Sequence, residues 1–160
     1  MKKLLLAAVM AVASISLAVA QPRAVGANLG YGVDVSYQHS LGTANMIDLS
    51  VNVPFFNGIG ATCTYDWIDP FNAPVPWNEK GEWHWYMGVG AGAGIYGFQA
   101  PDWFVGAVGH IGIEYDFWFP FQLSLDWRPN IGVVGHNGGG ADFNINGLWS
   151  GITLGVRYKF

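Results

Sequence analysis

Three polar residues in the second half of the chain could form a hydrolytic site. His110, Glu114 and Ser124 supply a base, an acid and a hydroxyl. Nucleophilic catalysis needs a serine within hydrogen-bond reach of a histidine that an acid orients. All three occupy the polar positions of alternating runs, so they share one face of a sheet, but alternation does not place them at one height. A sheet with a polar face needs such residues anyway, and we therefore predict no catalytic role for them.

Two other patterns suggest cofactors, and both fail on context. The stretch GAGIYG (92–97) matches a dinucleotide-binding fingerprint, but that fingerprint requires a helix directly after it, and FQAPDW (98–103) is typical of a turn. His84 and His110 could bind a metal only across strands, where ligand spacing cannot be judged. We expect no cofactor and no metal. The glycines at 88, 90, 92 and 94 fall on one strand face and should leave space for larger neighbours.

Charged residues also fall on the polar face of the predicted strands. An unpaired buried charge is costly, so we expect Arg128 and Arg157 to pair with Glu114 and Asp126 on adjacent strands. The charged residues predicted to face inward are Asp34, Asp48, Asp66, His84, His110, Glu114, Asp116, Asp126, Arg128, Arg157 and Lys159. If the predicted strands close into a narrow barrel, such pairs would fill and plug its lumen. The alternative is a narrow gated pore in which the pairs exchange partners.

The first twenty residues have the pattern of a secretory signal peptide. A basic start at Lys2 and Lys3 precedes an apolar run, and Ala18-Val19-Ala20 offers a small-residue cleavage site before Gln21. Residues 21–160 then form one domain, with five Lys or Arg against eleven Asp or Glu. That acidic balance argues against nucleic acid as a partner. The lone Cys63 cannot form an internal disulfide.

The composition favours a membrane β-barrel. Aromatic residues make up 16% of the chain and charged residues 11%, yet no segment after the signal approaches the roughly 20 apolar residues of a membrane helix. A closed barrel satisfies its backbone polar groups between strands. Seven segments alternate apolar and polar residues: 33–38, 47–53, 59–67, 83–96, 110–117, 121–128 and 152–160. Residues 24–30 supply an eighth strand, which predicts an all-β, eight-stranded antiparallel up-and-down transmembrane barrel.

The chain ends place the connections on two sides. Barrels of this kind keep both termini in the periplasm, which assigns 41–45 and 116–121 to periplasmic turns. The connections 55–58, 97–103 and 135–146 then face outward and could meet a surface ligand. The 68–82 connection would be periplasmic, although it is long for such a turn. If it were external, the strand count or the first strand would be wrong.

The last strand resembles the C-terminal recognition signal that the insertion machinery of outer-membrane barrels reads. It ends in Phe160, with apolar residues at alternate positions before it. The combination of GIEYDFWFPFQLSLDWRP (112–129) with RYKF (157–160) also resembles small barrels of the opacity-protein and OmpA-transmembrane type. The resemblance implies a protein exported to the bacterial outer membrane after cleavage following Ala20, with lipid and the insertion machinery as partners. The residues assigned to the insertion signal are Ile152, Leu154, Val156, Tyr158 and Phe160.

This family shares a fold and not one activity. We therefore predict a non-enzymatic outer-membrane protein with a structural or surface-interaction role, and keep the narrow pore as the second possibility. A lipid A or phospholipid hydrolase or acyltransferase is the third, since some small barrels modify lipids. Tryptophan and tyrosine near strand ends fit interfacial girdles. The alternative for Trp77 and Trp103 is a carbohydrate-binding platform.

Overall fold

The computed structural model covers the chain of 160 residues, and the structure describes residues 21–69, 80–97, 99–146 and 151–160. The predicted signal peptide, residues 1–20, lies outside the described residues, as does most of the 68–82 connection. Within these described ranges, no helix has both the length and the apolar character that a membrane crossing requires.

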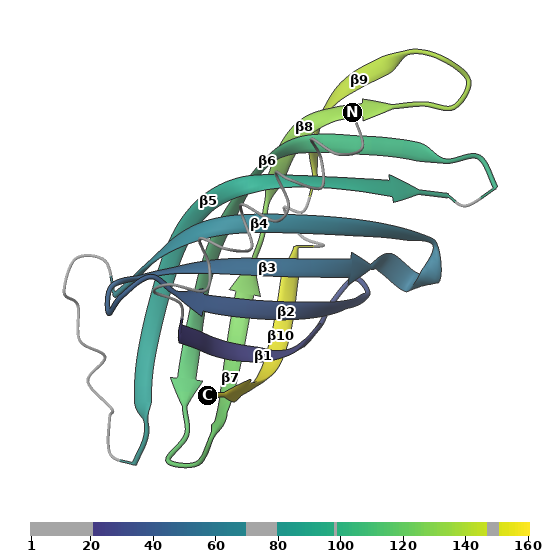
Figure 1. Cartoon of the computed structure of the whole chain (residues 1–160). Helices are drawn as coiled ribbons and strands as arrows, with labels where there is room; N and C mark the ends of the chain where they lie inside the picture. The colour runs from purple at the N-terminus through teal and green to yellow at the C-terminus, as the bar shows by residue number, and fades with distance from the viewer. Residues whose placement is uncertain (1–20, 70–79, 98, 147–150) are drawn as a thin grey trace, which may run out of the picture.

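The described residues form antiparallel strands joined in a single sheet (Figure 1). A short 3-10 helix, Pro54–Phe56, lies between β3 and β4. The strands are β1 (Gln21–Leu29), β2 (Val33–Ser40), β3 (Asn45–Val53), β4 (Gly58–Ile68), β5 (Glu82–Tyr96), β6 (Asp102–Asp116), β7 (Phe121–Trp127), β8 (Asn130–Gly135), β9 (Ala141–Asn146) and β10 (Ile152–Lys159).

Ten strand segments make eight positions in the barrel wall. β7 and β8 both pair with β6 in one continuous register, from Asp116 opposite Gln122 to Trp103 opposite Gly135. The break between them is at Arg128-Pro129, where proline has no N–H to donate to a ladder. β9 pairs with β8 and β10 with β7, so these two segments also share one position.

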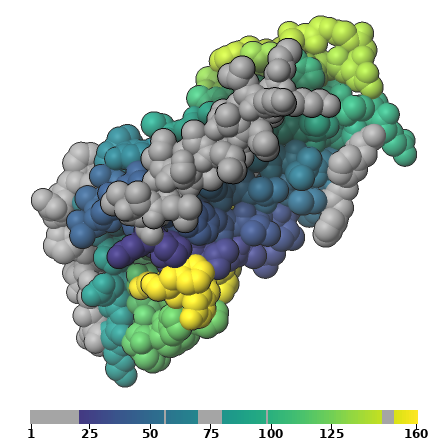
Figure 2. Space-filling model, in the orientation of Figure 1, coloured from purple at the N-terminus to yellow at the C-terminus, as the bar shows by residue number. Residues whose placement is uncertain are grey.

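The barrel closes through its two ends. β1 pairs with β10 along its length, from Ala24 opposite Lys159 to Leu29 opposite Leu154. Figure 2 shows the purple N-terminal strand seated beside the yellow C-terminal strand. With the β5–β6 pairing, the circuit of eight wall positions is closed, while β9 pairs on one side only, with β8. The predicted all-β, eight-stranded antiparallel closed barrel is confirmed, and so is the pairing of the last strand with the first.

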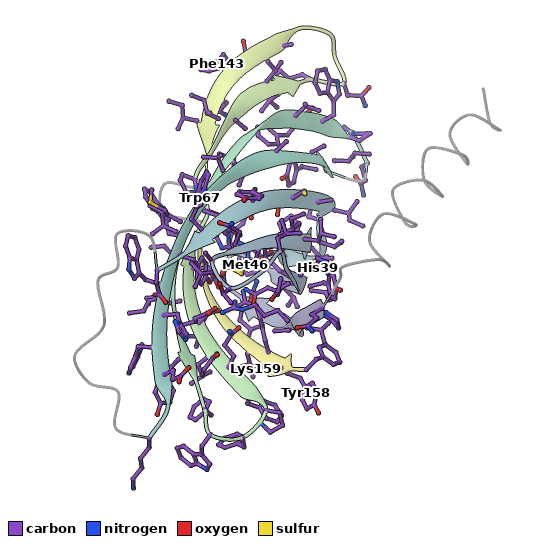
Figure 3. All side chains as sticks on the ribbon, turned by 60° about the vertical axis from the view of Figure 1, so that its left-hand side comes forward. His39, Met46, Trp67, Phe143, Tyr158 and Lys159 are labelled. Atoms are coloured by element: carbon purple, nitrogen blue, oxygen red, sulfur yellow. The ribbon has the colours of Figure 1, made fainter. Side chains whose placement is uncertain are left out.

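The interior of this barrel is polar and its outer surface is apolar. Among the described residues, the buried apolar side chains are few: Ala24, Met46, Tyr86, Phe104 and Val108. The buried polar or charged side chains are more than three times as many, and large apolar residues are exposed on every wall. Figure 3 shows the contrast, with Met46 in the interior and Tyr158 directed away from the barrel. This is the reverse of a soluble core.

The strands differ from the predicted ones at three places. β1 begins at Gln21 rather than Ala24, and β6 begins at Asp102 rather than near His110. The predicted outward loop 135–146 contains β9, which leaves a turn of only 136–140. Glycine and small residues hide the strand pattern here, because they carry little apolar signal on either face.

The two ends of the barrel differ in shape. Turn 117–120 lies at the same end as the beginning of β1 and the end of β10, since Lys159 N donates to Pro120 O at 3.1 Å and Phe160 N to Arg23 O at 3.1 Å. We call this the terminal end. The opposite end carries the β1–β2, β5–β6 and β8–β9 hairpins, and we call it the turn end. It is uneven because β5 and β6 have 15 residues each while β1–β3 have eight or nine. The β5–β6 and β8–β9 hairpins therefore project past the β1–β2 hairpin (Figure 1).

The glycine row on β5 allows its neighbours to fill the lumen. A Cβ atom at Gly88 would lie 1.9 Å from Asp66 Oδ1, and one at Gly90 would lie 1.9 Å from the Cys63 carbonyl oxygen. Neither position can carry a side chain without displacing β4. Gly92 and Gly94, from the pattern that resembled a nucleotide-binding loop, lie farther along the same strand, where a Cβ atom would be 3.0 Å from Val108 Cγ2 and 3.0 Å from the Tyr96 hydroxyl, respectively.

Candidate functional site

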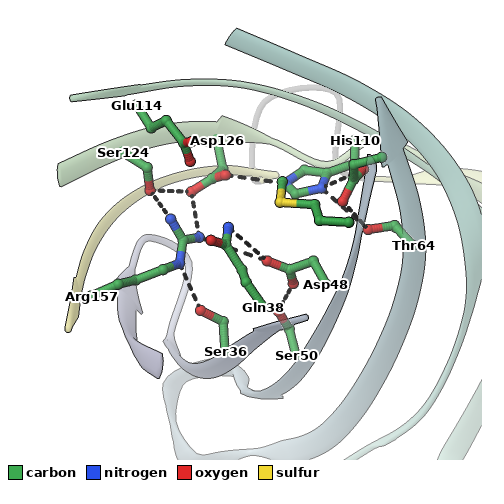
Figure 4. Close-up of polar contacts among 12 residues, drawn as sticks. Ser36, Gln38, Asp48, Ser50, Thr64, His110, Glu114, Ser124, Asp126 and Arg157 are labelled. Carbon is green, nitrogen blue, oxygen red and sulfur yellow. Dashed lines mark hydrogen bonds and ion pairs between the residues drawn. The ribbon is translucent and has the colours of Figure 1, made fainter. Parts of the chain in front are cut away.

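The centre of the lumen holds a fully buried arginine whose donors nearly all have partners. Arg157, on β10, contacts Asp126 Oδ2 through Nη2 at 3.1 Å and donates from Nε to Ser36 Oγ at 2.9 Å (Figure 4). Its Nη1 donates to Ser124 Oγ at 2.5 Å and lies 3.5 Å from Gln122 Oε1. A guanidinium held by groups on β2 and β7 cross-links strands that are distant in sequence.

Asp126 connects this arginine to a buried histidine. Its Oδ1 lies 3.0 Å from His110 Nε2, and the other ring nitrogen of His110 lies 3.0 Å from Asp66 Oδ1. His110 therefore bridges two carboxylates, with Thr64 Oγ1 3.2 Å from Nδ1. The Tyr86 hydroxyl also donates to Asp126. All of these groups are buried, and together they fill the middle of the lumen.

A second cluster lies toward the turn end. Arg128 donates from Nη2 to Asp48 Oδ1 at 3.1 Å and from Nη1 to Ser50. Asp48 also faces Arg157, with Asp48 Oδ2 3.9 Å from Nη2. Farther out, Asp34 accepts a hydrogen bond from Asn52. This cluster shares Asp48 with the central one, so the two form one network.

The third cluster occupies the terminal end. Glu114 is fully buried and pairs with Arg23 of β1. Lys159 Nζ lies 2.5 Å from Asp116 Oδ2, and Gln122 Nε2 donates to Asp116 Oδ1 at 3.0 Å. These pairs join the first, sixth and last strand segments where the barrel closes. Ion pairs therefore occupy the lumen at three successive levels.

The partners within the network differ in part from the expected ones. The structure brings Arg157 and Asp126 together on paired strands, whereas Arg128 pairs with Asp48 and Glu114 pairs with Arg23. Sequence reasoning missed Arg23 because it precedes the predicted first strand. The register shifts between Pro22 and Ala24, and a bulge of that kind redirects a side chain. Of the charged residues expected to face inward, His84 and Lys159 are only partly buried.

The candidate hydrolytic residues do not form a serine–histidine pair. Ser124 Oγ donates to Asp126 Oδ2 at 2.7 Å, while both ring nitrogens of His110 face carboxylates. Glu114 lies in the terminal-end cluster with Arg23. Within the described part of the chain, no group of three or more His, Cys, Asp or Glu residues is placed to hold a metal ion.

A cavity of about 440 Å³ opens at the turn end of the lumen, above Arg128. Asp34 and Asn52 line it on one side, and Phe104 and Val108 of the projecting β6 line the other. The cavity exists because the polar network stops at Arg128 while β5, β6 and β8 continue outward.

The tip of the β8–β9 hairpin is held by an exposed histidine. His136 lies 3.0 Å from Asp102 Oδ2 through Nδ1 and 3.2 Å from Asp142 Oδ2 through Nε2. Hydrogen bonding to Asp102, and then to Asp142, raises the pKa of His136 above its usual value. The protonated ring donates to both carboxylates, so it ties β6 to the hairpin that follows.

The residues assigned to the insertion signal all lie on the outer surface. Ile152, Leu154, Val156, Tyr158 and Phe160 are exposed, while Thr153, Gly155 and Arg157 between them are buried. Trp103 is also on the outer surface, where its ring covers the backbone of Gly135. Trp77 lies outside the described residues.

Comparison of the chain with protein-family models, with curated proteins and with solved structures found no match.

Removal of the central arginine should destabilise the barrel strongly. We expect Arg157→Met to lower the free energy of unfolding by about 3–5 kcal/mol, because Asp126 would remain buried without its arginine. Lys159→Met is the matched control, since its pair is partly exposed at the terminal end, and about 1 kcal/mol or less is expected there. Urea unfolding in detergent micelles measures both. Equal losses would show that the network does not depend on Arg157.

The hairpin tip should loosen as pH rises. Because the folded state raises the pKa of His136, its contribution is complete below the ordinary histidine pKa and is lost as pH rises through the raised value. Amide hydrogen exchange at 136–140, corrected for the intrinsic pH dependence, should become faster across that interval. His136→Gln should abolish the pH step, and a step that survives in this variant would assign it to another group.

Proposed function

We propose that this chain is an integral β-barrel protein of the bacterial outer membrane, with a lumen sealed by ion pairs and no catalytic role. It would act structurally or present its turn end to a surface ligand. The inverted distribution of polarity carries this proposal. A closed barrel with a charged interior and an apolar outer wall is suited to a surrounding of lipid, because its apolar side chains face the lipid and its polar side chains face the lumen.

The outer wall has the two features that a lipid environment favours. The middle parts of its strands expose aliphatic side chains on the outer surface, for example those of Leu49, Val51, Leu125 and Val156. Its terminal end carries a chain of aromatic contacts. The rings of Phe121 and Tyr158 are 5.9 Å apart and those of Tyr158 and Phe160 are 5.5 Å apart, centre to centre. Aromatic rings at a barrel edge fit the headgroup level of a bilayer.

The chain resembles opacity-protein and OmpA-transmembrane barrels in its last third and in its number of strands. The pattern of residues 1–20 supports export through a signal peptide cleaved after Ala20. From the resemblance we carry over recognition of the outward residues of β10 by the barrel-insertion machinery. Their exposure in the folded barrel is compatible with such a signal, since none of them is needed inside. Membrane lipid is then the main partner of the wall.

The network favours a sealed lumen over a pore. Arg157 contacts Ser36 on β2 and Asp126 on β7, the strands on either side of the β1–β10 seam, and His110 joins Asp126 to Asp66. An open path would require several buried ion pairs to separate together, each at a cost of several kcal/mol. The one feature that favours the narrow-pore alternative is Asp48, which lies between Arg128 and Arg157 and could exchange between them.

A charge on the outer wall should be costly only in the membrane zone. Val156 lies in the middle of β10, opposite Ala27 and Leu123, and is exposed. We expect Val156→Arg to make folding into phospholipid vesicles less favourable by about 2–4 kcal/mol, because a charge would then face the lipid. Leu41→Arg is the control, because Leu41 is also exposed but lies in the β2–β3 turn, and little change is expected. Equal effects at both positions would contradict the membrane assignment.

The sealed lumen predicts no conductance. Purified wild-type protein reconstituted into planar lipid bilayers should add no discrete current steps, because ion pairs occupy three levels of the lumen. The control is an unrelated porin reconstituted in the same way. Discrete steps from the wild-type protein that change with Asp48→Asn would establish the narrow pore instead.

A further inference from the structure

The cavity at the turn end differs in character from the lumen below it. Its volume of about 440 Å³ lies in the usual range of small-molecule sites, about 300–1,000 Å³. Two of the few buried apolar residues among the described ones, Phe104 and Val108, line it. The interior elsewhere is mainly polar. An apolar patch at this opening is therefore a distinct feature of the mouth.

Three polar groups in this cavity have no hydrogen-bond partner. Among the described residues, the buried side-chain atoms without one include Arg128 Nε, Thr62 Oγ1 and Thr153 Oγ1, and all three residues line the cavity. Arg128 is 8% exposed and Thr153 is 7% exposed. Buried polar atoms are nearly always satisfied, so an unsatisfied cluster indicates a bound molecule or water. A group that both donates and accepts would suit this set, since it consists of two hydroxyls and one N–H donor.

The charged side chains that line the cavity, Arg128, Asp34 and Asp102, already have partners, and for Asp102 the partner is His136. Arg128 uses Nη1 and Nη2 for Ser50 and Asp48, and only Nε remains. Asp34, which lines the same cavity, accepts from Asn52 and lies close enough to Arg128 to feel its charge. A further anion would meet Asp34, and a further cation would meet Arg128. An uncharged ligand is therefore favoured.

The opposite wall supplies aromatic surface. Tyr96 lines the cavity, and its hydroxyl is 3.5 Å from the position that a Cβ atom on Gly60 would occupy, so the ring leans across the inner face of β4. Phe104 lies on the neighbouring strand β6. A molecule that fits this wall needs an apolar face. Thr62 on the adjacent strand β4, together with Thr153 and Arg128, requires hydroxyl groups at the edge of that molecule.

We propose that the turn-end cavity binds a small uncharged saccharide, with ring hydroxyls at Arg128, Thr62 and Thr153 and C–H groups against Phe104 and Tyr96. A pyranose ring has both surfaces, because its hydroxyls lie at the edge and its C–H groups on the faces. This site goes beyond the proposed function and does not depend on it, since binding can be measured on the folded barrel in detergent.

The test uses the mature chain, residues 21–160, folded in lauryldimethylamine oxide, a detergent without a sugar headgroup. D-glucose, N-acetyl-D-glucosamine and maltose serve as probes. Saturation-transfer NMR detects binding and identifies the protons in contact with protein, and calorimetry gives the affinity. We expect at least one probe to bind, with the strongest transfer to ring C–H protons. Sodium acetate and sodium phosphate are the charged comparators and should not bind.

Two variants test the location without touching the ion pairs. Thr153→Val removes a hydroxyl that has no internal partner, and we expect affinity to fall roughly three- to tenfold, the usual effect of one neutral hydrogen bond. Gly60→Leu should fill the cavity and abolish binding, since a Cβ atom there meets only ordinary contacts. Thr43→Val in the β2–β3 turn, at the other end of the barrel, is the matched control and should bind as wild type.

The possible outcomes separate clearly. Failure of all three sugars to bind would overturn the proposal, and so would binding of acetate or phosphate alone. Binding that Gly60→Leu and Thr153→Val leave unchanged would place the sugar elsewhere and would also overturn it. Circular dichroism of each variant establishes that the barrel is folded, and Thr153→Val remains a test if Gly60→Leu does not fold.

Discussion

The contact between Arg157 and Asp126 is the interaction on which the lumen depends. Both side chains are fully buried, and between them they reach Ser36, Ser124, His110 and Tyr86. In a barrel with a polar interior, the spacing between the walls is not set by the packing of an apolar core. Hydrogen bonds and ion pairs must then fix the spacing of the walls, and each charge needs a partner because desolvation is costly. The glycines of β5 are part of the same solution, since they give the network its space.

Period-two alternation is enough to predict which face each residue takes. Asp34, Asp126 and Arg157 are buried where alternation places them, and Val35, Leu125 and Val156 are exposed. The ion-pair partners are predicted less well from alternation, because a contact across the lumen depends on the register between strands. Arg128 meets Asp48 and not Glu114, although all three point inward. Alternation carries no information about height, so pairs between distant walls cannot be read from one sequence.

Irregular positions account for the remaining differences. The bulge at Pro22–Ala24 brings Arg23 to Glu114, and the Arg128-Pro129 break divides one wall between β7 and β8. The glycine-rich stretch before Ala141 lacks an alternating pattern, so the beginning of β9 could not be predicted from the sequence. The cavity itself arises from strand lengths, since the long β5 and β6 extend beyond the last ion pair. Neither a bulge nor a difference in strand length has a strong signature in composition, so the turn-end cavity could not be predicted from the sequence.

The pairing of β1 with β10 also has a consequence for how the barrel folds. Most neighbouring strands are hairpins, whose ends meet at little entropic cost, and the longest hairpin, β5–β6, can form locally. The closing pair joins Leu29 to Leu154, across nearly the whole sequence. A contact between residues so distant in sequence is expected to form late and slowly during folding. Until it forms, the sheet has two unpaired edges, each able to accept a strand from another chain. The pairing of β1 with β10 therefore removes both of these exposed edges at once.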